Sequence, residues 1–128
     1  LETLSVPAYS PELTLSSHTL FPMYDYKIKA YGTADAGDTI TFDPQYSITG
    51  RIEGDSWTDS VSGYESYGPG LLELFVNGSD IDWGSYNEDH TYYYELAGTG
   101  GPLSLYINDI YYPNNVGYLS ADLIVKLY

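Results

Sequence analysis

Apolar and polar residues alternate most clearly in the last quarter of the chain. Leu103, Leu105 and Ile107 are separated by single polar or aromatic residues, which is the period of a half-buried β-strand. The same alternation returns over residues 119–127. The pattern therefore predicts two strands, joined by a loop over residues 108–118.

Six other segments have strand-like composition and are bounded by glycine, proline or asparagine. They are residues 24–31, 39–42, 45–52, 71–76, 79–83 and 91–97. Asn77-Gly78 is a strong signal for a tight hairpin, so we expect residues 71–76 to pair with residues 79–83. No segment shows the 3.6-residue period of a helix. About eight short strands with turn residues between them predict an all-β fold, a β-sandwich or jelly roll, in a single domain.

Two segments lack this regular pattern. Residues 1–23 contain three of the seven prolines, and proline is tolerated at sheet edges and in connectors. We therefore expect an N-terminal edge strand or linker over residues 1–23 and the β-sandwich domain over residues 24–128. Residues 53–70 form a long stretch without periodicity, which in a compact domain is either functional or mobile.

The charge of the chain excludes some partners. Eighteen acidic and four basic residues give a net charge of −14, which repels phosphate backbones and makes nucleic acid an unsuitable partner.

No run of about 18 apolar residues is present, so no insertion into a membrane is expected. Cysteine is absent, which excludes disulfides and thiolate metal sites. Because the chain starts at Leu1 without a basic, apolar leader, we expect a processed protein or an excised domain.

The loop at residues 108–118 gathers hard oxygen donors. It holds one carboxylate and three side-chain amides: Asp109, Asn108, Asn114 and Asn115. Calcium takes six to eight oxygen ligands in irregular geometry, so such a loop can form one wall of a calcium site. The alternative is an ordinary long hairpin, in which the same side chains cap turns.

Four motifs follow one another in a recognisable order. They are Gly-Asp-Thr-Ile-Thr at 37–41, Gly-Leu-Leu-Glu-Leu-Phe-Val-Asn-Gly at 70–78, Leu-Tyr-Ile-Asn-Asp at 105–109 and Asn-Asn-Val-Gly-Tyr-Leu at 114–119. Together they resemble the PA-I galactophilic lectin family of calcium-dependent bacterial β-sandwich lectins, over roughly residues 28–127. The resemblance implies a carbohydrate-binding module that uses calcium and is secreted or lies at the cell surface.

The resemblance also implies site residues. The calcium ligands would be the side chains of Asp109, Asn114 and Asn115, with a carbonyl from the middle of the same loop, at Ile110, Tyr111 or Tyr112. A further carbonyl comes from an earlier loop. Its position here is either near Thr49 or Gly50, or in the Ser-Tyr-Gly-Pro stretch at residues 66–69.

Sugar recognition would take place on the ion. Two vicinal hydroxyls replace calcium-bound waters and donate to Asp109 and to an amide such as Asn108. Aromatic side chains in loops would cover the apolar face of the sugar; the candidates are Tyr111, Tyr112, Tyr67 and Trp57. Strand packing is the alternative role for a tyrosine. Galactosides or plant and cell-surface glycans are the implied partners, bound by a homo-oligomer or by a domain appended to a larger protein.

This sequence departs from the family in two respects, of which the first concerns a carbonyl ligand of the calcium loop and the second concerns sugar choice. The Asp109 loop is about two residues shorter than in the galactose-binding lectin, and that lectin's sugar-contacting His and Gln have no counterpart here. The resemblance therefore implies the fold, and galactose specificity is not implied.

Other function classes are less well supported by the residues. Carboxylate pairs that could serve glycoside hydrolysis are Asp55 with Asp59 and Asp80 with Asp82, but eighteen acids in 128 residues place such pairs by chance. His18 and His90 lack the spacing of a zinc site, and no Gly-x-Ser-x-Gly motif occurs, so we expect no enzyme. The remaining alternative is a structural or adhesion β-sandwich module of a larger protein.

Overall fold

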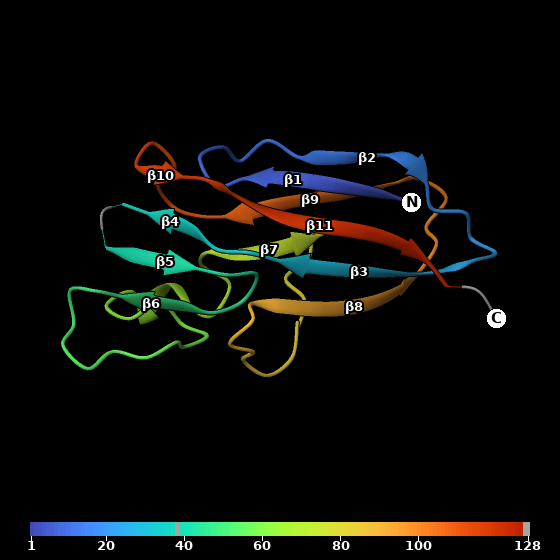
Figure 1. Cartoon of the computed structure of the whole chain (residues 1–128). Coiled ribbons are helices and arrows are strands. Elements are labelled where there is room, and N and C mark those ends of the chain that lie inside the picture. Colours follow the sequence, from blue (N-terminus) through green and yellow to red (C-terminus); the bar gives the residue numbers. More distant parts are fainter. Residues whose placement is uncertain (38, 127–128) are drawn as a thin grey trace.

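A computed structural model describes residues 1–37 and 39–126. In this part of the chain eleven strands form three antiparallel sheets (Figure 1). The strands are β1 (Glu2–Pro7), β2 (Thr14–Thr19), β3 (Asp25–Tyr31), β4 (Ala34–Ala36), β5 (Ile40–Phe42), β6 (Ser47–Thr49), β7 (Glu73–Val76), β8 (Thr91–Ala97), β9 (Pro102–Asn108), β10 (Asn115–Val116) and β11 (Tyr118–Val125). The only helical element described is a single 3₁₀ turn, Glu65–Tyr67, and no helix is long and apolar enough to cross a membrane.

Two sheets enclose the core. One has the order β1-β11-β3-β8 and the other β2-β9-β7. Along β3 and β9 every second side chain is buried, as the alternation predicts, and the buried side chains of both sheets belong to one apolar cluster. The all-β prediction is confirmed, and the arrangement is sandwich-like; the jelly-roll topology stays a prediction.

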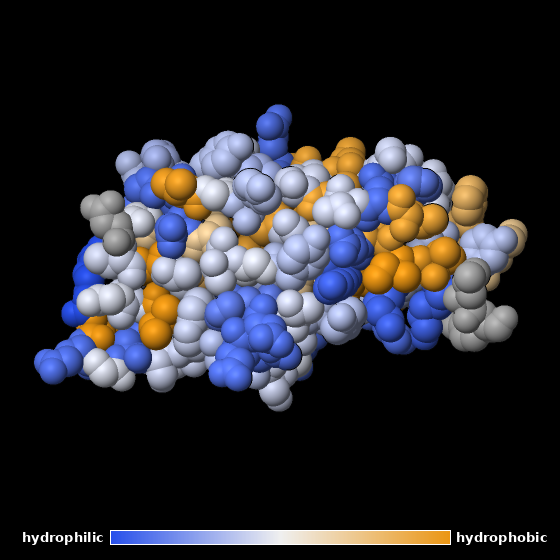
Figure 2. Space-filling model, in the orientation of Figure 1, coloured by the Kyte–Doolittle hydropathy of each residue, from blue (hydrophilic) through white to orange (hydrophobic). Residues whose placement is uncertain are grey.

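The third sheet, β10-β4-β5-β6, lies at one end of the molecule, on the left in Figure 1. It brings the end of the Asp109 loop, as β10, against β4, where Asn115 pairs with Ala36. This short sheet positions the loop that the sequence singles out. On the face drawn in Figure 2 the surface is mostly hydrophilic, with separate apolar patches.

Residues 1–23 supply an edge strand to each of the two sheets that enclose the core. β1 pairs with β11, and β2 pairs with β9. Glu2 joins the two edges, because its carboxylate accepts hydrogen bonds from the backbone N–H groups of Ser17 and His18. Val6 and Leu20 are fully buried in the core.

The expected pairing of residues 71–76 with residues 79–83 is wrong. The turn itself is present, with positive φ at Asn77 and Gly78 and a single bridge from Val76 to Ser79. β7 pairs instead with β9, and the indole Nε1 of Trp83 donates to the carbonyl of Leu74 at 3.0 Å. The chain after the turn therefore packs against β7 without forming a strand.

The hairpin alternative for the C-terminal segment is also wrong. β9 and β11 lie in different sheets, so the loop between them crosses from one sheet to the other. β4 was not expected, because three residues are too few to show an alternating pattern. Asp38 of the Gly-Asp-Thr-Ile-Thr motif and residue 127 of the last expected strand lie outside the described residues.

Candidate functional site

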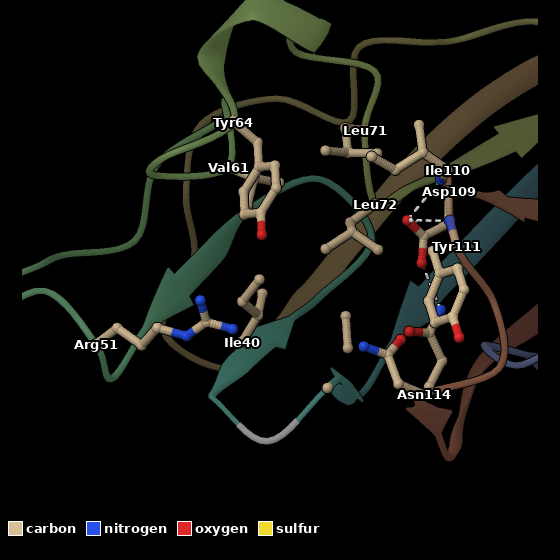
Figure 3. A pocket seen from close by; sticks show the side chains of 13 residues that line it. Ile40, Arg51, Val61, Tyr64, Leu71, Leu72, Asp109, Ile110, Tyr111 and Asn114 are labelled. Atoms are coloured by element: carbon tan, nitrogen blue, oxygen red, sulfur yellow. Dashed lines mark hydrogen bonds between the residues drawn. The ribbon is translucent and has the colours of Figure 1, made fainter.

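A cleft of about 260 Å³ opens beside the Asp109 loop (Figure 3). Asp109, Tyr111 and Asn114 lie on one side of it, and Arg51 and Tyr64 lie on the other, from the loops that follow β6 and precede β7. Ile40 and Leu72 lie between the two sides. The cleft thus has polar walls of opposite charge and an apolar middle.

Hydrogen bonds fix the carboxylate of Asp109. Its Oδ1 accepts from the backbone N–H of Ile110 at 2.6 Å, and its Oδ2 accepts from Nδ2 of Asn115 at 2.6 Å. Asn115 is buried, and its Nδ2 also donates to the carbonyl of Ala8 at 2.8 Å. The other end of this amide, Oδ1, is buried without a hydrogen-bond partner. A buried acceptor that lacks a donor is destabilising unless a ligand or water satisfies it.

Asn114 connects the loop to the third sheet. Its carbonyl accepts from the backbone N–H of Gly37 at 2.9 Å. Gly37 has a φ of +69°, and a Cβ there would lie 3.0 Å from Nδ2 of Asn114. A glycine is therefore required at this position both by the backbone conformation and by the close approach of the amide.

Tyr112 braces the loop from inside. Its hydroxyl donates to the carbonyl of Ile107 at 2.7 Å and accepts from the backbone N–H of Asp109 at 3.0 Å. Burial raises the pKa of Tyr112, so the hydroxyl remains a donor at neutral pH. Its neighbour Tyr111 is 59% exposed and lines the cleft. Tyr111 therefore presents an aromatic ring to the cleft, whereas the hydroxyl of Tyr112 holds the backbone.

The other expected site residues lie outside the cleft lining. Thr49 is buried on β6 and lines a neighbouring cavity. Asn108 donates from Nδ2 to the carbonyl of Gly70 at 3.0 Å. Tyr67 is exposed on the 3₁₀ turn, with its ring 6.3 Å from that of Tyr64. Thus Asp109, Tyr111, Asn114 and Asn115 line the cleft together, and Thr49, Asn108, Tyr112, Tyr67 and Trp57 do not line it. Tyr112 nevertheless contacts Asp109 through its hydroxyl.

Trp57 belongs to a separate aromatic cluster. Its ring stacks on Tyr86 at 5.7 Å between centroids and lies 4.5 Å from the imidazole of His90. His90 is itself paired through Nδ1 with Asp43, at 2.8 Å, and Asp43 is fully buried. The imidazole of His90 is therefore partly buried and held by a buried carboxylate.

Arg51 and Tyr64 are cleft residues that the sequence did not indicate. Arg51 donates from Nε to Oγ1 of Thr39 at 3.0 Å, which holds its side chain along the third sheet. Both residues come from loops without any motif. The only available signal is that Arg51 is the single arginine in a strongly acidic chain.

The cleft contains donors of the kind that calcium takes. Asp109 supplies a carboxylate, and Asn114 and Asn115 supply amide oxygens, of which Oδ1 of Asn115 is buried without a hydrogen-bond partner. Among residues 1–37 and 39–126, no three acidic or histidine side chains converge as metal ligands. An ion in this cleft would therefore be held by one carboxylate, by amides and carbonyls, and by water.

A second cleft, of about 270 Å³, has different chemistry. It is lined by Gln45, Asp59, Glu73, Asp80 and Asp82, together with Pro69 and Ile81. Glu73 is buried, and this burial, with Asp59 and Asp80 beside it, raises its pKa to about 11. Of the two carboxylate pairs considered for glycoside hydrolysis, Asp80 and Asp82 both line this cleft, together with Asp59. Asp55, the expected partner of Asp59, does not line it, and its carboxylate accepts from the backbone N–H of Thr49 at 2.8 Å.

Comparison with protein families, with curated proteins and with solved structures finds no match for this chain. The resemblance to the galactophilic lectins accordingly stays a prediction that depends on the residues themselves.

Proposed function

We propose that this protein is a calcium-dependent carbohydrate-binding module, lectin-like in mode, that binds glycan hydroxyls in the Asp109 cleft. The observation that carries the proposal is that Asp109, Asn114, Asn115 and the exposed Tyr111 line one cleft, with Oδ1 of Asn115 a buried acceptor that has no hydrogen-bond partner. A cleft with an apolar middle and a few polar groups at its walls suits a sugar, which has an apolar face and a polar rim.

Each group has a role in this binding mode. When bound, a calcium ion held by Asp109, Asn114 and Asn115 would supply the positive charge on which two sugar hydroxyl oxygens rest. Asp109 also accepts a hydrogen bond from a hydroxyl, and the guanidinium of Arg51, on the facing wall, donates to hydroxyl oxygens. The rings of Tyr111 and Tyr64 cover the apolar face of the sugar. No bond is made or broken, so the function is recognition and not turnover.

A secreted or cell-surface module with neutral glycans as partners is consistent with the charge of −14. An acidic surface does not attract nucleic acid, and it does not oppose the binding of an uncharged sugar. We extend the proposal to this location and to glycan partners, with calcium as the cofactor.

One observation favours a second function, a structural or adhesion module. Both carboxylate oxygens of Asp109 already accept hydrogen bonds within the loop, and Asn115 links the loop to Ala8. The same groups can therefore serve as a brace between the N-terminal segment and the loop. In that case calcium would stiffen the loop, or would not bind, and no sugar would bind.

The test is a calorimetric calcium titration of chelator-treated protein, followed by a glycan array with and without the ion. Asp109→Asn keeps the size of the side chain and the acceptor for Ile110, but it removes the charge and the acceptor for Nδ2 of Asn115. We expect it to abolish calcium binding in this cleft. Asp89→Ala is the control, because Asp89 is exposed and lines neither cleft. Calcium-dependent glycan signals support the lectin function; calcium binding with a silent array supports the structural module.

A further inference from the structure

A buried carboxyl group stands at the centre of the second cleft. Glu73, the first residue of β7, is 2% exposed and lines this cleft. A carboxylate that is buried without a cation carries a large desolvation cost, and it avoids this cost by keeping its proton. Burial and the neighbouring carboxyl groups accordingly raise the pKa of Glu73 to about 11. Glu73 is therefore a neutral carboxylic acid at neutral pH.

The groups that face Glu73 from the surrounding segments are acidic or neutral. Among residues 1–37 and 39–126, no lysine, arginine or histidine lines the cleft. An ionised Glu73 would therefore lie among other negative charges, with no positive side chain to offset them. The facing groups are Asp59 in the loop before β7, Asp80 and Asp82 after the Asn77-Gly78 turn, Gln45 and Tyr46 between β5 and β6, and Asn108 opposite Glu73 on β9.

One proton accounts for the hydrogen bonding of this cluster. Oε2 of Glu73 and Oδ1 of Asp59 are buried acceptors with no donor partner. Glu73 forms side-chain hydrogen bonds with Asp59 and Asp80, and a hydrogen bond between two carboxyl groups requires a proton on one of them. The proton belongs to the cluster as a whole. Glu73 is its most buried member, because Asp59 is half-buried and Asp80 is exposed.

The cluster ties two loops to β7. Asp59 belongs to the loop before β7, and Tyr64 of the same loop forms part of the wall that faces Asp109 in the first cleft (Figure 3). Asp80 belongs to the segment of residues 79–83, which lies on β7. Both loops therefore reach the start of β7 through a hydrogen bond that the proton makes possible.

Gln45 links the same two loops without any charge. Its Nε2 donates to Oδ2 of Asp59 at 3.3 Å, and its Oε1 accepts from the backbone N–H of Trp83. Loss of the proton from Glu73 would turn the hydrogen bonds to Asp59 and Asp80 into repulsion between like charges. The amide of Gln45 cannot neutralise that charge, so ionisation of Glu73 pushes both loops away from β7.

We propose that the proton shared by Glu73, Asp59 and Asp80 is a pH-sensitive latch, which holds residues 53–70 and 79–83 on β7 in acidic surroundings and releases them as the pH rises. In the open form Glu73 titrates near the usual 4.5, and in the closed form it keeps its proton to about pH 11. The stability that the latch contributes is complete below pH 4.5 and is lost progressively between these two values. The latch acts whatever the Asp109 cleft binds.

The test is the pH dependence of urea unfolding, from about pH 4 to about pH 8. Glu73→Gln keeps a neutral side chain of the same size that cannot ionise. Glu53→Gln is the charge-matched control, because Glu53 is exposed and lines neither cleft. The unfolding constant of wild type, divided by that of Glu73→Gln, should rise about tenfold per pH unit above 4.5, or about 300-fold by pH 7. The same ratio against Glu53→Gln should stay constant. A ratio against Glu73→Gln that does not change with pH would overturn the latch.

Two measurements on wild type decide the matter even if Glu73→Gln fails to fold. Infrared spectra of protein with isotope-labelled glutamate should show a protonated glutamate carboxyl at neutral pH, and complete ionisation would contradict the shared proton. Hydrogen exchange reports on the loop itself, through the backbone N–H groups of Thr58 and Tyr64, which donate to the carbonyls of Ser47 and Val61 at 2.9 Å. Their protection factors should fall about tenfold per pH unit above 4.5. Protection that is independent of pH would mean that the proton does not hold the loop.

Discussion

Asn115→Ala tests whether the buried amide is a calcium ligand or only a brace. In the absence of calcium the substitution removes a hydrogen bond to the Ala8 carbonyl and one to the Asp109 carboxylate. These contribute about 1 kcal/mol and about 2 kcal/mol, because the second acceptor is charged. The substitution also removes the unpartnered Oδ1, whose desolvation costs about 1–2 kcal/mol. The net loss of stability should be about 1–2 kcal/mol.

In saturating calcium the expected cost of Asn115→Ala in the free energy of unfolding is larger. If Oδ1 ligates the ion, the wild-type protein has no orphaned oxygen, so the substitution costs the full ~3 kcal/mol plus the lost stabilisation by bound calcium. The measurement is urea unfolding in chelator and in excess calcium, analysed by linear extrapolation. Asn114→Ala removes the other amide of the proposed site; because Asn114 is exposed, in chelator this substitution should cost no more than about 0.5 kcal/mol. Equal costs of Asn115→Ala in the two conditions would refute its role as a ligand.

Two further predictions concern contacts that stabilise the fold away from the Asp109 cleft. Burial alone would raise the pKa of Glu2, but the hydrogen bonds from His18 and its neighbour outweigh this effect and hold the pKa at about 2, below the usual 4.5. Ionised Glu2 therefore stabilises the fold above pH 4.5, and this contribution is lost as the pH falls toward 2. In Glu2→Gln, the free energy of unfolding from urea titrations should fall less steeply with decreasing pH than in wild type. The same pH dependence in both proteins would count against the contact. Gly98→Ala would place a Cβ 1.9 Å from the carbonyl oxygen of Phe21 and should cost about 3 kcal/mol. Gly101→Ala is the control, because a Cβ at residue 101 would have no heavy atom within 4 Å, and it should leave the melting temperature nearly unchanged. Equal stability of the two variants would contradict the close approach of Gly98 to Phe21.

The sequence predicts the strands well where one face of a sheet is buried. In β3, β9 and β11 the alternation of side chains directly reflects burial. Pairing is a different matter, because it depends on contacts distant in sequence. Asn77-Gly78 correctly predicts a turn, yet β7 finds its partner in β9, since a local turn signal says nothing about which strand lies on the other side.

The candidate site could likewise be predicted where its residues are close in sequence, and not where they meet only through the fold. Asp109, Asn114 and Asn115 could be identified because the donors are crowded into a single loop. Arg51 and Tyr64 could not, because they reach the cleft only through the fold of the third sheet and of the loop before β7. Trp57 packs on Tyr86 and His90, outside the lining of the Asp109 cleft, and its expected contact with a ligand stays a prediction.

The most direct test of the account is the calcium dependence of glycan binding in wild type and in Asp109→Asn. The account predicts glycan binding by wild type that chelator abolishes and calcium restores, and no glycan binding by a folded Asp109→Asn protein under either condition. Glycan binding that survives both the chelator and the substitution would contradict the assignment of the Asp109 cleft as the carbohydrate site.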